Sequence, residues 1–313
     1  MPANPILIGV DGSLEAAGAA GMGYHLARLA GVRCHLVHAA REVWTDLAAV
    51  QLPDRTYELN RALQSQAREQ VAAGLRDAVP RELIDQMIVR LGRAAVVIQQ
   101  IATEQDAGLI VLGGKHHTAL GRWLGGSTSL NVVRTARVPV LVTAKGPAEI
   151  KRVMVATDLS PAARPTIDLA ERYAALFGAQ LRALNVMEPL PIVPEVPPVD
   201  PAEYYELTEE LLRRDIWPLV TLPGAERVAR HGMVVDTLLR EAAEWPADLL
   251  VVGSHGKGWA ERVLLGSVTE QLLNHLPTAL LVVPVGATEA VTPSPPPAVG
   301  KRPPTKTARS SAV

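Results

Sequence analysis

Three glycines and a serine late in the chain are spaced as a phosphate-binding loop would need them. Gly253 and Gly256 follow the apolar run at residues 249–252, and nine residues separate Gly256 from Gly266 and Ser267. The apolar run is short and partly β-branched, so we expect a buried strand ahead of the loop. Glycines let the backbone approach a ligand closely and adopt positive φ. Ser267 stands at the expected N-cap of a helix, whose free N–H groups attract phosphate. The pattern predicts a site for a phosphate chain.

An earlier part of the chain repeats this pattern with one important change. The matched residues, 140 positions apart, are Gly113, Gly126 and Ser127 in the first copy and Gly253, Gly266 and Ser267 in the second. In the first copy His116 stands where the second glycine belongs, and its side chain would hinder the approach of phosphate or a positive φ. We expect a weakened or empty first site, with direct phosphate contact by Lys115 or His116 as the alternative.

The elements that must position these loops alternate between strand and helix through both halves. Strands are expected near residues 6–10, 34–38, 84–91, 109–112 and 139–142, then 152–156, 181–187, 228, 249–252 and 279–283. Helices are expected over 14–30, 55–79, 94–105 and 127–135, then 160–177, 202–217, 235–245 and from 267. Ser160 is the expected N-cap of its helix. This alternation predicts an α/β fold of two tandem flavodoxin- or Rossmann-like domains, each with a five-stranded parallel sheet and helices on both faces.

Acidic residues end the first strand of each half. Asp11 and Asp158 are 147 positions apart, and each follows an apolar strand pattern. Ligands of parallel α/β folds bind beyond the carboxyl ends of the strands. Asp158 and Gly253 are therefore expected to face one crevice, and Asp11 and Gly113 to face another.

The chain divides into three parts. The Lys-Gly-Pro sequence at 145–147 interrupts the pattern, so we place the two domains at residues 1–147 and 148–286. Residues 287–313 are rich in proline and carry four basic residues against one acid. Such a segment is expected to be disordered, either as a solubilising tail or as one that binds partners or is phosphorylated.

Composition and missing motifs argue against several classes of function. The formal net charge of −1 gives no electrostatic case for binding nucleic acid or a membrane surface, and no apolar run reaches the length of a membrane span. The single cysteine, Cys34, and an N-terminus without a leader pattern indicate a cytoplasmic protein. The histidines lack metal-ligand spacing, so no metal site is expected. Gly21 and Gly23 mimic a dinucleotide fingerprint but lie inside a helical pattern, where small residues pack.

These features together resemble the universal stress protein family in its tandem two-domain form, over about residues 4–145 and 150–285. The resemblance rests on the first strands with their acidic ends, at 6–13 and 153–160, on the second glycine motif, and on the closing strand at 139–142. It implies a five-stranded parallel α/β sandwich in each domain. It also implies that the domains pair through their last strands, here within one chain, with a homodimer as a further option.

By this resemblance the second domain binds ATP together with Mg²⁺. Asp158 would approach the adenosine part, and Val186 would line the adenine pocket at the end of the second strand. The ribose and the phosphates would be held by Gly253, Gly256, Gly266 and Ser267. Further lining residues would be Thr157, His255, Val268 and Thr269. Weaker candidates in the first domain are Asp11, Gly113, Gly126 and Ser127.

The resemblance favours a nucleotide-binding protein of stress response or signalling. ATP would bias the pairing of the domains or the binding of an unknown protein partner. No residue near the motif is evidently a base for activating water, so we expect no dedicated enzyme and at most slow ATP hydrolysis. The alternative is an interaction module that binds no nucleotide, in which the glycine loops are structural and the tail binds partners.

Overall fold

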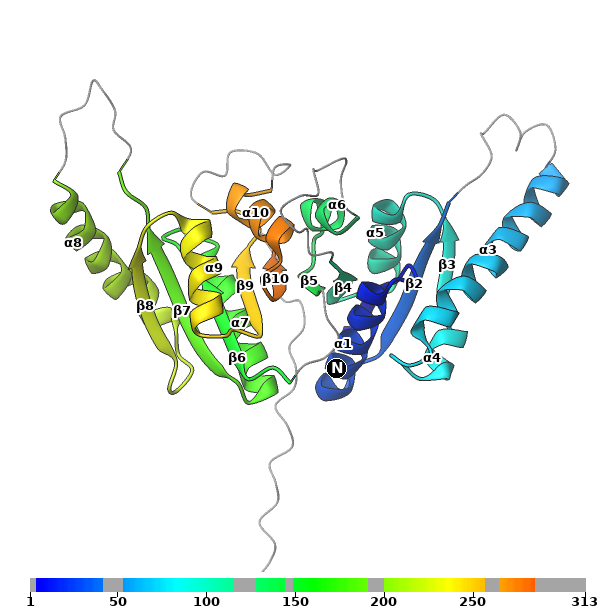
Figure 1. Ribbon diagram of the computed structural model, residues 1–313, viewed down its shortest axis with the longest axis horizontal. Helices are drawn as coiled ribbons and strands as arrows, with labels where there is room; N and C mark the ends of the chain where they lie inside the picture. The colour runs from blue at the N-terminus through cyan, green and yellow to red at the C-terminus, as the bar shows by residue number, and fades with distance from the viewer. Residues whose placement is uncertain are drawn as a thin grey trace, which may run out of the picture.

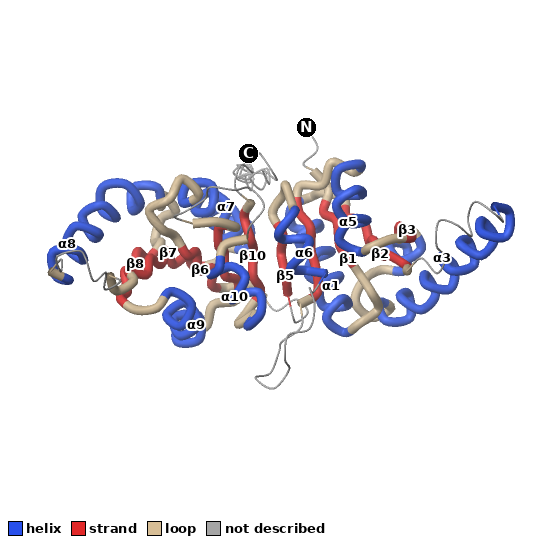
Figure 2. Tube along the Cα trace, turned by 90° about the horizontal axis from the view of Figure 1, so that it is seen from above, coloured by secondary structure: helices blue, strands red, loops and turns tan. Residues whose placement is uncertain are grey.

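The computed structural model describes residues 4–41, 53–114, 128–143, 149–190, 200–256 and 265–284 of the chain. Its strands form one ten-stranded sheet in the order β3-β2-β1-β4-β5-β10-β9-β6-β7-β8. Figure 1 shows the two halves side by side, with β5 and β10 at the centre and α3 and α8 toward the outer ends. Helices lie on both sides of the strands (Figure 2). Within the described ranges, no helix combines the length and apolar character that crossing a membrane requires.

The first half alternates strands and helices as the sequence predicts. Its strands are β1 (Ile6–Gly9), β2 (Cys34–Ala40), β3 (Ile88–Leu91), β4 (Leu109–Gly113) and β5 (Val140–Thr143). Its helices are α1 (Leu14–Ala30), α3 (Pro53–Leu75), α4 (Arg81–Asp85), α5 (Ala94–Glu104) and α6 (Thr128–Thr135). Every strand pair within this half is parallel. The segment expected as one strand at 84–91 is divided, because Pro80 starts the short helix α4 before β3 begins.

The second half repeats this arrangement. Its strands are β6 (Arg152–Ala156), β7 (Gln180–Met187), β8 (Glu226–His231), β9 (Leu249–Gly253) and β10 (Ala279–Val283). Its helices are α7 (Ala163–Phe177), α8 (Pro201–Leu211), α9 (Val234–Glu244) and α10 (Ser267–His275). A π-helical turn (Leu212–Ile216) and a 3₁₀ turn (Trp217–Leu219) follow α8. The strand pairs within this half are also parallel, and the predicted fold class is confirmed.

Two helix boundaries in the second half differ from the prediction. The helix expected to run from 202 to 217 is α-helical only to Leu211. A π-helical turn over Leu212–Ile216 and a 3₁₀ turn that contains Pro218 follow it. Proline lacks the N–H that an α-helix interior needs. Ser160 is not the N-cap of α7, which begins at Ala163. Its hydroxyl instead accepts a hydrogen bond from the N–H of Ala162 at 3.3 Å, within the turn before the helix.

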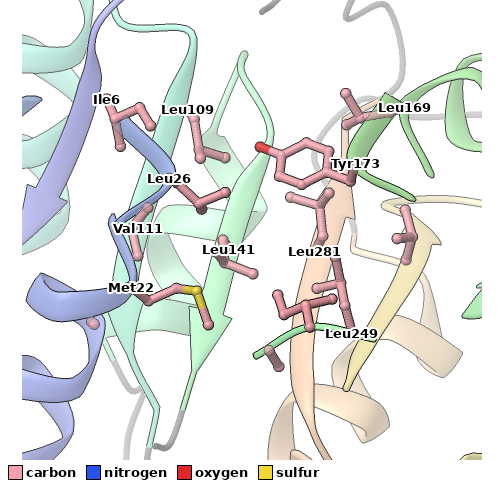
Figure 3. Close-up of a cluster of buried hydrophobic side chains, with 14 of the residues drawn as sticks. Ile6, Met22, Leu26, Leu109, Val111, Leu141, Leu169, Tyr173, Leu249 and Leu281 are labelled. Carbon is pink, nitrogen blue, oxygen red and sulfur yellow. The ribbon is translucent and has the colours of Figure 1, made fainter. Parts of the chain in front are cut away.

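Strands β5 and β10 join the two halves by an antiparallel pairing, with Leu281 opposite Leu141. Both side chains are buried, and they belong to one cluster of apolar residues that includes Met22 from α1 and Tyr173 from α7. Figure 3 shows Leu141 and Leu281 between the side chains of the two halves. The last strands therefore pair within the chain, as the resemblance implies, and the halves share this apolar cluster.

Buried glycines in α1 serve packing rather than ligand binding. Gly21 and Gly23 lie within the helix and are buried there. A Cβ atom on Gly23 would lie 2.7 Å from the side chain of Ile8 on β1. The glycine therefore lets α1 approach the sheet closely, which supports the packing interpretation of this stretch.

Glycine ends two of the long helices in the same way. Gly31 after α1 and Gly178 after α7 adopt left-handed conformations with φ of 67° and 63°. An added Cβ at either residue would meet no atom within 4 Å. Gly178→Ala is therefore expected to lower the free energy of unfolding by about 1 kcal/mol through backbone conformation alone. Urea unfolding measures this loss, and Gly31→Ala should show a similar one. A gain in stability in either variant would contradict the explanation.

Candidate functional site

A cavity of about 690 Å³ opens beyond the carboxyl ends of β6, β7 and β9. Every residue that the sequence predicts for a site in the second half lines it. These residues are Thr157, Asp158, Val186, Gly253, His255, Gly256, Gly266, Ser267, Val268 and Thr269. Asp158 and Gly253 thus face one crevice, as expected from the strand ends. The structure brings the predicted residues together, while their contacts with a ligand stay a prediction.

Backbone hydrogen bonds fold the glycine loop against the start of α10. The N–H of Gly266 donates to the carbonyl of Ser254 at 2.9 Å, and the N–H of Ser254 donates to the carbonyl of Val283 at 2.7 Å. The hydroxyl of Thr269 donates to the carbonyl of Gly253 at 2.8 Å. These bonds hold the end of β9 and the N-terminus of α10 side by side, and the first residues of α10 line the cavity. The first N–H groups of a helix have no partner within the helix.

The backbone conformations of the three glycines and the N-cap of α10 differ from the prediction. None of Gly253, Gly256 and Gly266 has a positive φ. Gly266, with φ of −60° and ψ of 139°, is itself the N-cap of α10 and makes no side-chain cap, so Ser267 is the first helical residue rather than the cap. The prediction of positive φ and of a Ser267 N-cap was wrong, because these three glycines keep φ outside the left-handed region and α10 begins at Ser267 itself.

Close approach is the reason for glycine at these positions. A Cβ atom on Gly256 would lie 2.7 Å from Oδ2 of Asp158, and one on Gly266 would lie 3.1 Å from the carbonyl oxygen of Ser254. Any larger residue at 256 would have to displace the Asp158 carboxylate. Gly256 therefore lets the loop after β9 touch the residue after β6, and Gly266 lets the start of α10 approach the same loop.

Asp158 is held in place by the turn that follows β6. Its Oδ1 accepts a hydrogen bond from the N–H of Ser160 at 3.0 Å. The preceding residue, Thr157, donates its N–H to the carbonyl of Leu184 at 2.9 Å and accepts from Nδ2 of Asn185 at 2.8 Å. The ends of β6 and β7 are thus tied together beside the Asp158 carboxylate.

Sequence reasoning missed several residues of the cavity wall. The main ones are Asn185 and Met187 on β7, Tyr204 and Thr208 on α8, and Val234 and Leu238 on α9. Asn185 had a visible signal, since it interrupts the apolar end of strand 181–187. The helix residues had none, because which face of α8 and α9 meets the strand ends depends on tertiary packing.

Unpaired buried polar atoms gather at this cavity. In the part of the chain that the structure describes, the buried side-chain atoms without a hydrogen-bond partner are Nε2 of His35, Oδ1 of Asn185 and Nε2 of His255. Asn185 and His255 both line the cavity. The other ring nitrogen of His255 lies 2.9 Å from the hydroxyl of Ser254. Buried polar groups are normally paired, so this pattern is typical of a ligand site.

The corresponding region of the first half is packed by its own chain. Asp11 accepts hydrogen bonds from the N–H and the hydroxyl of Ser13, at 3.1 and 2.6 Å. A Cβ on Gly113 would lie 2.8 Å from the backbone of Glu15 in α1. A Cβ on Gly74 of α3 would lie 2.5 Å from the carbonyl oxygen of Gly12, so helix and loop are in direct contact. Lys115, His116, Gly126 and Ser127 lie outside the described residues.

The loop after the first strand differs between the halves in the size of one residue. Counting from the two aspartates, Leu159 stands where the first half has Gly12, the residue whose carbonyl oxygen lies beside Gly74 of α3. This difference lies in the described residues and is independent of His116.

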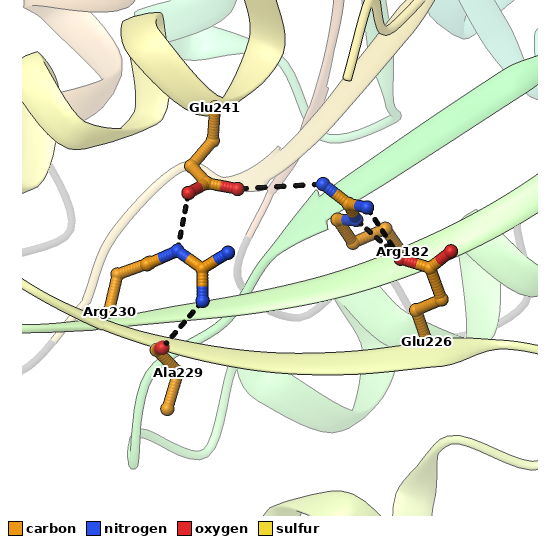
Figure 4. A network of polar contacts seen from close by, with 5 residues as sticks. All are labelled: Arg182, Glu226, Ala229, Arg230 and Glu241. Carbon is orange, nitrogen blue, oxygen red and sulfur yellow. Dashed lines mark hydrogen bonds and ion pairs between the residues drawn. The ribbon is translucent and has the colours of Figure 1, made fainter. Parts of the chain in front are cut away.

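The wall that α9 contributes is anchored by a buried carboxylate, Glu241 (Figure 4). Its side chain is 4% exposed, and it pairs with Nε of Arg230 at 2.5 Å and Nη1 of Arg182 at 3.5 Å. Arg182 also pairs with Glu226 at 2.6 Å and lies over the ring of Trp245, 4.5 Å from its centre. These contacts fix α9 against β7 and β8.

Comparison with known proteins adds independent observations. A family model described as the universal stress protein family matches residues 3–144 and 149–284. A universal stress protein of Mycobacterium tuberculosis is 28% identical over 291 residues, covering 86% of this chain and 93% of that protein. One of Thermus aquaticus is 35% identical over 134 residues, covering 42% of this chain and 98% of that protein.

A solved structure shows the same fold. The crystal structure of a universal stress protein from Archaeoglobus fulgidus is similar with a TM-score of 0.57 and 18% identity, over 91% of this chain and all of that one. A universal stress protein solved in complex with cAMP is 28% identical, over 44% of this chain and 98% of that one, with a TM-score of 0.34.

Proposed function

Because the chain belongs to the universal stress protein family, we propose that it is a nucleotide-binding member, with one ATP site in its second half. One observation carries this proposal. The glycine loop after β9, the carboxylate after β6 and the end of β7 line a single cavity. These strands are neighbours in the sheet, in the order β9, β6, β7. A nucleotide laid across them would meet a phosphate site, an acceptor for ribose hydroxyls and a base site in turn.

The N-terminus of α10 supports the phosphate end of this assignment. The helix has nine residues, and its N-cap makes no side-chain hydrogen bond to the first N–H groups. Free N–H groups and the positive end of the helix dipole favour an anion there. The described residues hold no cluster of three or more histidine, cysteine or acidic side chains around a metal position. We therefore assign Mg²⁺ to the phosphates of the nucleotide rather than to a site built by the protein.

The same helix offers a route from the nucleotide to the other half. Glu270 of α10 lies 3.8 Å from Arg134 of α6. At the C-terminal end of α10, the side chain of Leu276 packs against Gly114 of the first half. A Cβ atom added to Gly114 would lie 2.5 Å from that side chain. In our proposal the domains are residues 1–147 and 148–286, and binding at α10 biases how they pair or which partner they contact. The bias requires different affinities of ATP for the two arrangements.

We assign a binding role rather than a dedicated catalytic one, with slow hydrolysis at most. Two carboxylates, Asp158 and Glu188, line the cavity. Glu188 directly follows β7, at the base end of the proposed site, away from the phosphates. Asp158 packs against Gly256 and accepts from the turn after β6. Its place on the middle strand suits contact with ribose better than activation of water at a terminal phosphate.

Calorimetric titration of the full chain with ATP tests the proposal. Protein first freed of retained nucleotide is expected to bind ATP with a stoichiometry near one, because the first half is packed against α3. A stoichiometry near two would show that both halves bind and would overturn the single-site assignment. No binding would favour the alternative, an interaction module with structural glycine loops.

A further inference from the structure

The phosphate motif leaves the amide of Asn185 unexplained. The residue is 5% exposed and lines the cavity from β7. Its Nδ2 donates to the carbonyl of Thr157 at 2.8 Å, and this fixes the orientation of the amide because a carbonyl accepts only from the nitrogen. Oδ1 then has no partner among the described residues. A buried acceptor without a donor is unfavourable, so this wall of the cavity is suited to a ligand that brings a donor.

Neighbouring hydroxyl groups do not supply that donor. The hydroxyls of three threonines around the cavity donate to backbone carbonyls instead. Thr157 donates to Asp158 at 3.4 Å, Thr166 donates to Ala162 at 2.7 Å, and Thr208 donates to Tyr204 at 2.8 Å. The nearby cavity wall is otherwise mostly apolar, with Met187, Leu190 and Leu238 among its residues. A flat apolar group with one polar edge fits such surroundings.

The position of Asn185 in the sheet selects which part of a nucleotide reaches it. Strand β6 pairs with both β9 and β7, so Asn185 lies two strand spacings from the glycine loop, roughly 10 Å. With phosphates at the start of α10 and ribose beside Asp158, the base falls at the end of β7. The donor nearest to Oδ1 is then a group on the edge of the base.

We propose that Oδ1 of Asn185 accepts a hydrogen bond from the exocyclic amino group of the base, and so makes the site selective for adenine over purines without that group. The inference rests on the proposed nucleotide site. A purine with hydrogen at this position leaves the acceptor unpaired. A 6-oxo purine places a second acceptor against it. A site built to pair with a donor rejects both analogues.

The first half supplies a matched comparison. His38 stands 147 positions before Asn185 and makes the same cross-strand contact, with Nδ1 lying 2.7 Å from the carbonyl oxygen of Val10. Removing either side chain therefore breaks an equivalent tie between the ends of two strands. Only the residue in the second half lines the cavity described above.

Competition calorimetry on the full chain tests the inference with ATP, purine riboside triphosphate and ITP. The wild-type protein is expected to bind the two analogues roughly tenfold to a hundredfold more weakly than ATP. Asn185→Leu should bind all three alike, near the affinity of the wild type for purine riboside triphosphate. His38→Leu should keep the wild-type ratios. Urea unfolding shows whether each variant is folded.

Several outcomes would overturn the assignment. One is equal binding of ATP and purine riboside triphosphate by the wild type, a comparison that needs no variant to fold. Another is a folded Asn185→Leu that keeps the wild-type ratio. A third uses 2′-deoxy-ATP: if Asn185→Leu loses discrimination against this analogue alone, the donor is a ribose hydroxyl. Failure to bind any nucleotide would instead refute the proposed function itself, so the two failures are distinguishable.

Discussion

Replacing Glu241 with alanine is expected to lower the free energy of unfolding by about 3 kcal/mol. Breaking a buried ion pair leaves an uncompensated charge in a region of low dielectric, which costs about 3–5 kcal/mol. The lower end applies here because Arg230 is partly exposed and Arg182 keeps its pair with Glu226. Urea unfolding of the variant and the wild type measures the difference.

The first half again offers a matched control. Arg90 on β3 pairs with Glu104 on α5 at 2.5 Å, but these side chains are 40% and 47% exposed, against 4% for Glu241. Glu104→Ala should therefore change stability little, because exposed pairs are screened by water and salt. Equal losses in the two variants would show that burial does not set the strength of the Glu241 contacts.

Replacing Gly266 with glutamate is expected to weaken ATP binding by more than about a hundredfold, or about 2.7 kcal/mol. Gly266 lines the cavity, and a Cβ at this position is already tight against the Ser254 carbonyl, so we expect the side chain to extend toward the cavity. Its carboxylate would then lie at the N-terminus of α10 and satisfy the N–H groups that we assign to phosphate. The carboxylate of the variant would therefore compete with the phosphates of ATP for the same N–H groups.

Calorimetry on Gly266→Glu alongside Gly126→Glu isolates this effect. The second variant makes the same change at the matched position of the first half, and we expect it to bind ATP like the wild type. Wild-type affinity in a folded Gly266→Glu would remove α10 from the phosphate site. Loss of binding in Gly126→Glu as well would point to a site shared by both halves.

Patterns that depend on neighbouring residues in sequence were predictable. The alternation of strand and helix predicted the fold class. The repeated glycine spacing and the two aspartates predicted residues of the second half that line one cavity. Backbone detail was less accessible. The absence of positive φ at Gly256 and the cap at Gly266 depend on hydrogen bonds to Ser254 and on the position of Asp158.

Features set by packing between distant segments were missed. Glu241 looks like an ordinary polar position of an amphipathic helix, and only the approach of Arg182 and Arg230 from two strands makes it a buried anchor. The contact of Gly74 with Gly12 likewise joins a helix to a loop that lies far from it in sequence. Such partners cannot be read from local spacing, because the same residue types also occur on helix faces that meet only solvent.

The antiparallel pairing of β5 with β10 also bears on how the protein behaves on dilution. Each of these strands already has a neighbour on both sides, so neither offers an open edge to another molecule. Covalent linkage turns the encounter of the halves into an intramolecular event with a high effective concentration. The paired arrangement should therefore persist at nanomolar protein, where two separate chains joined by the same short strands would come apart.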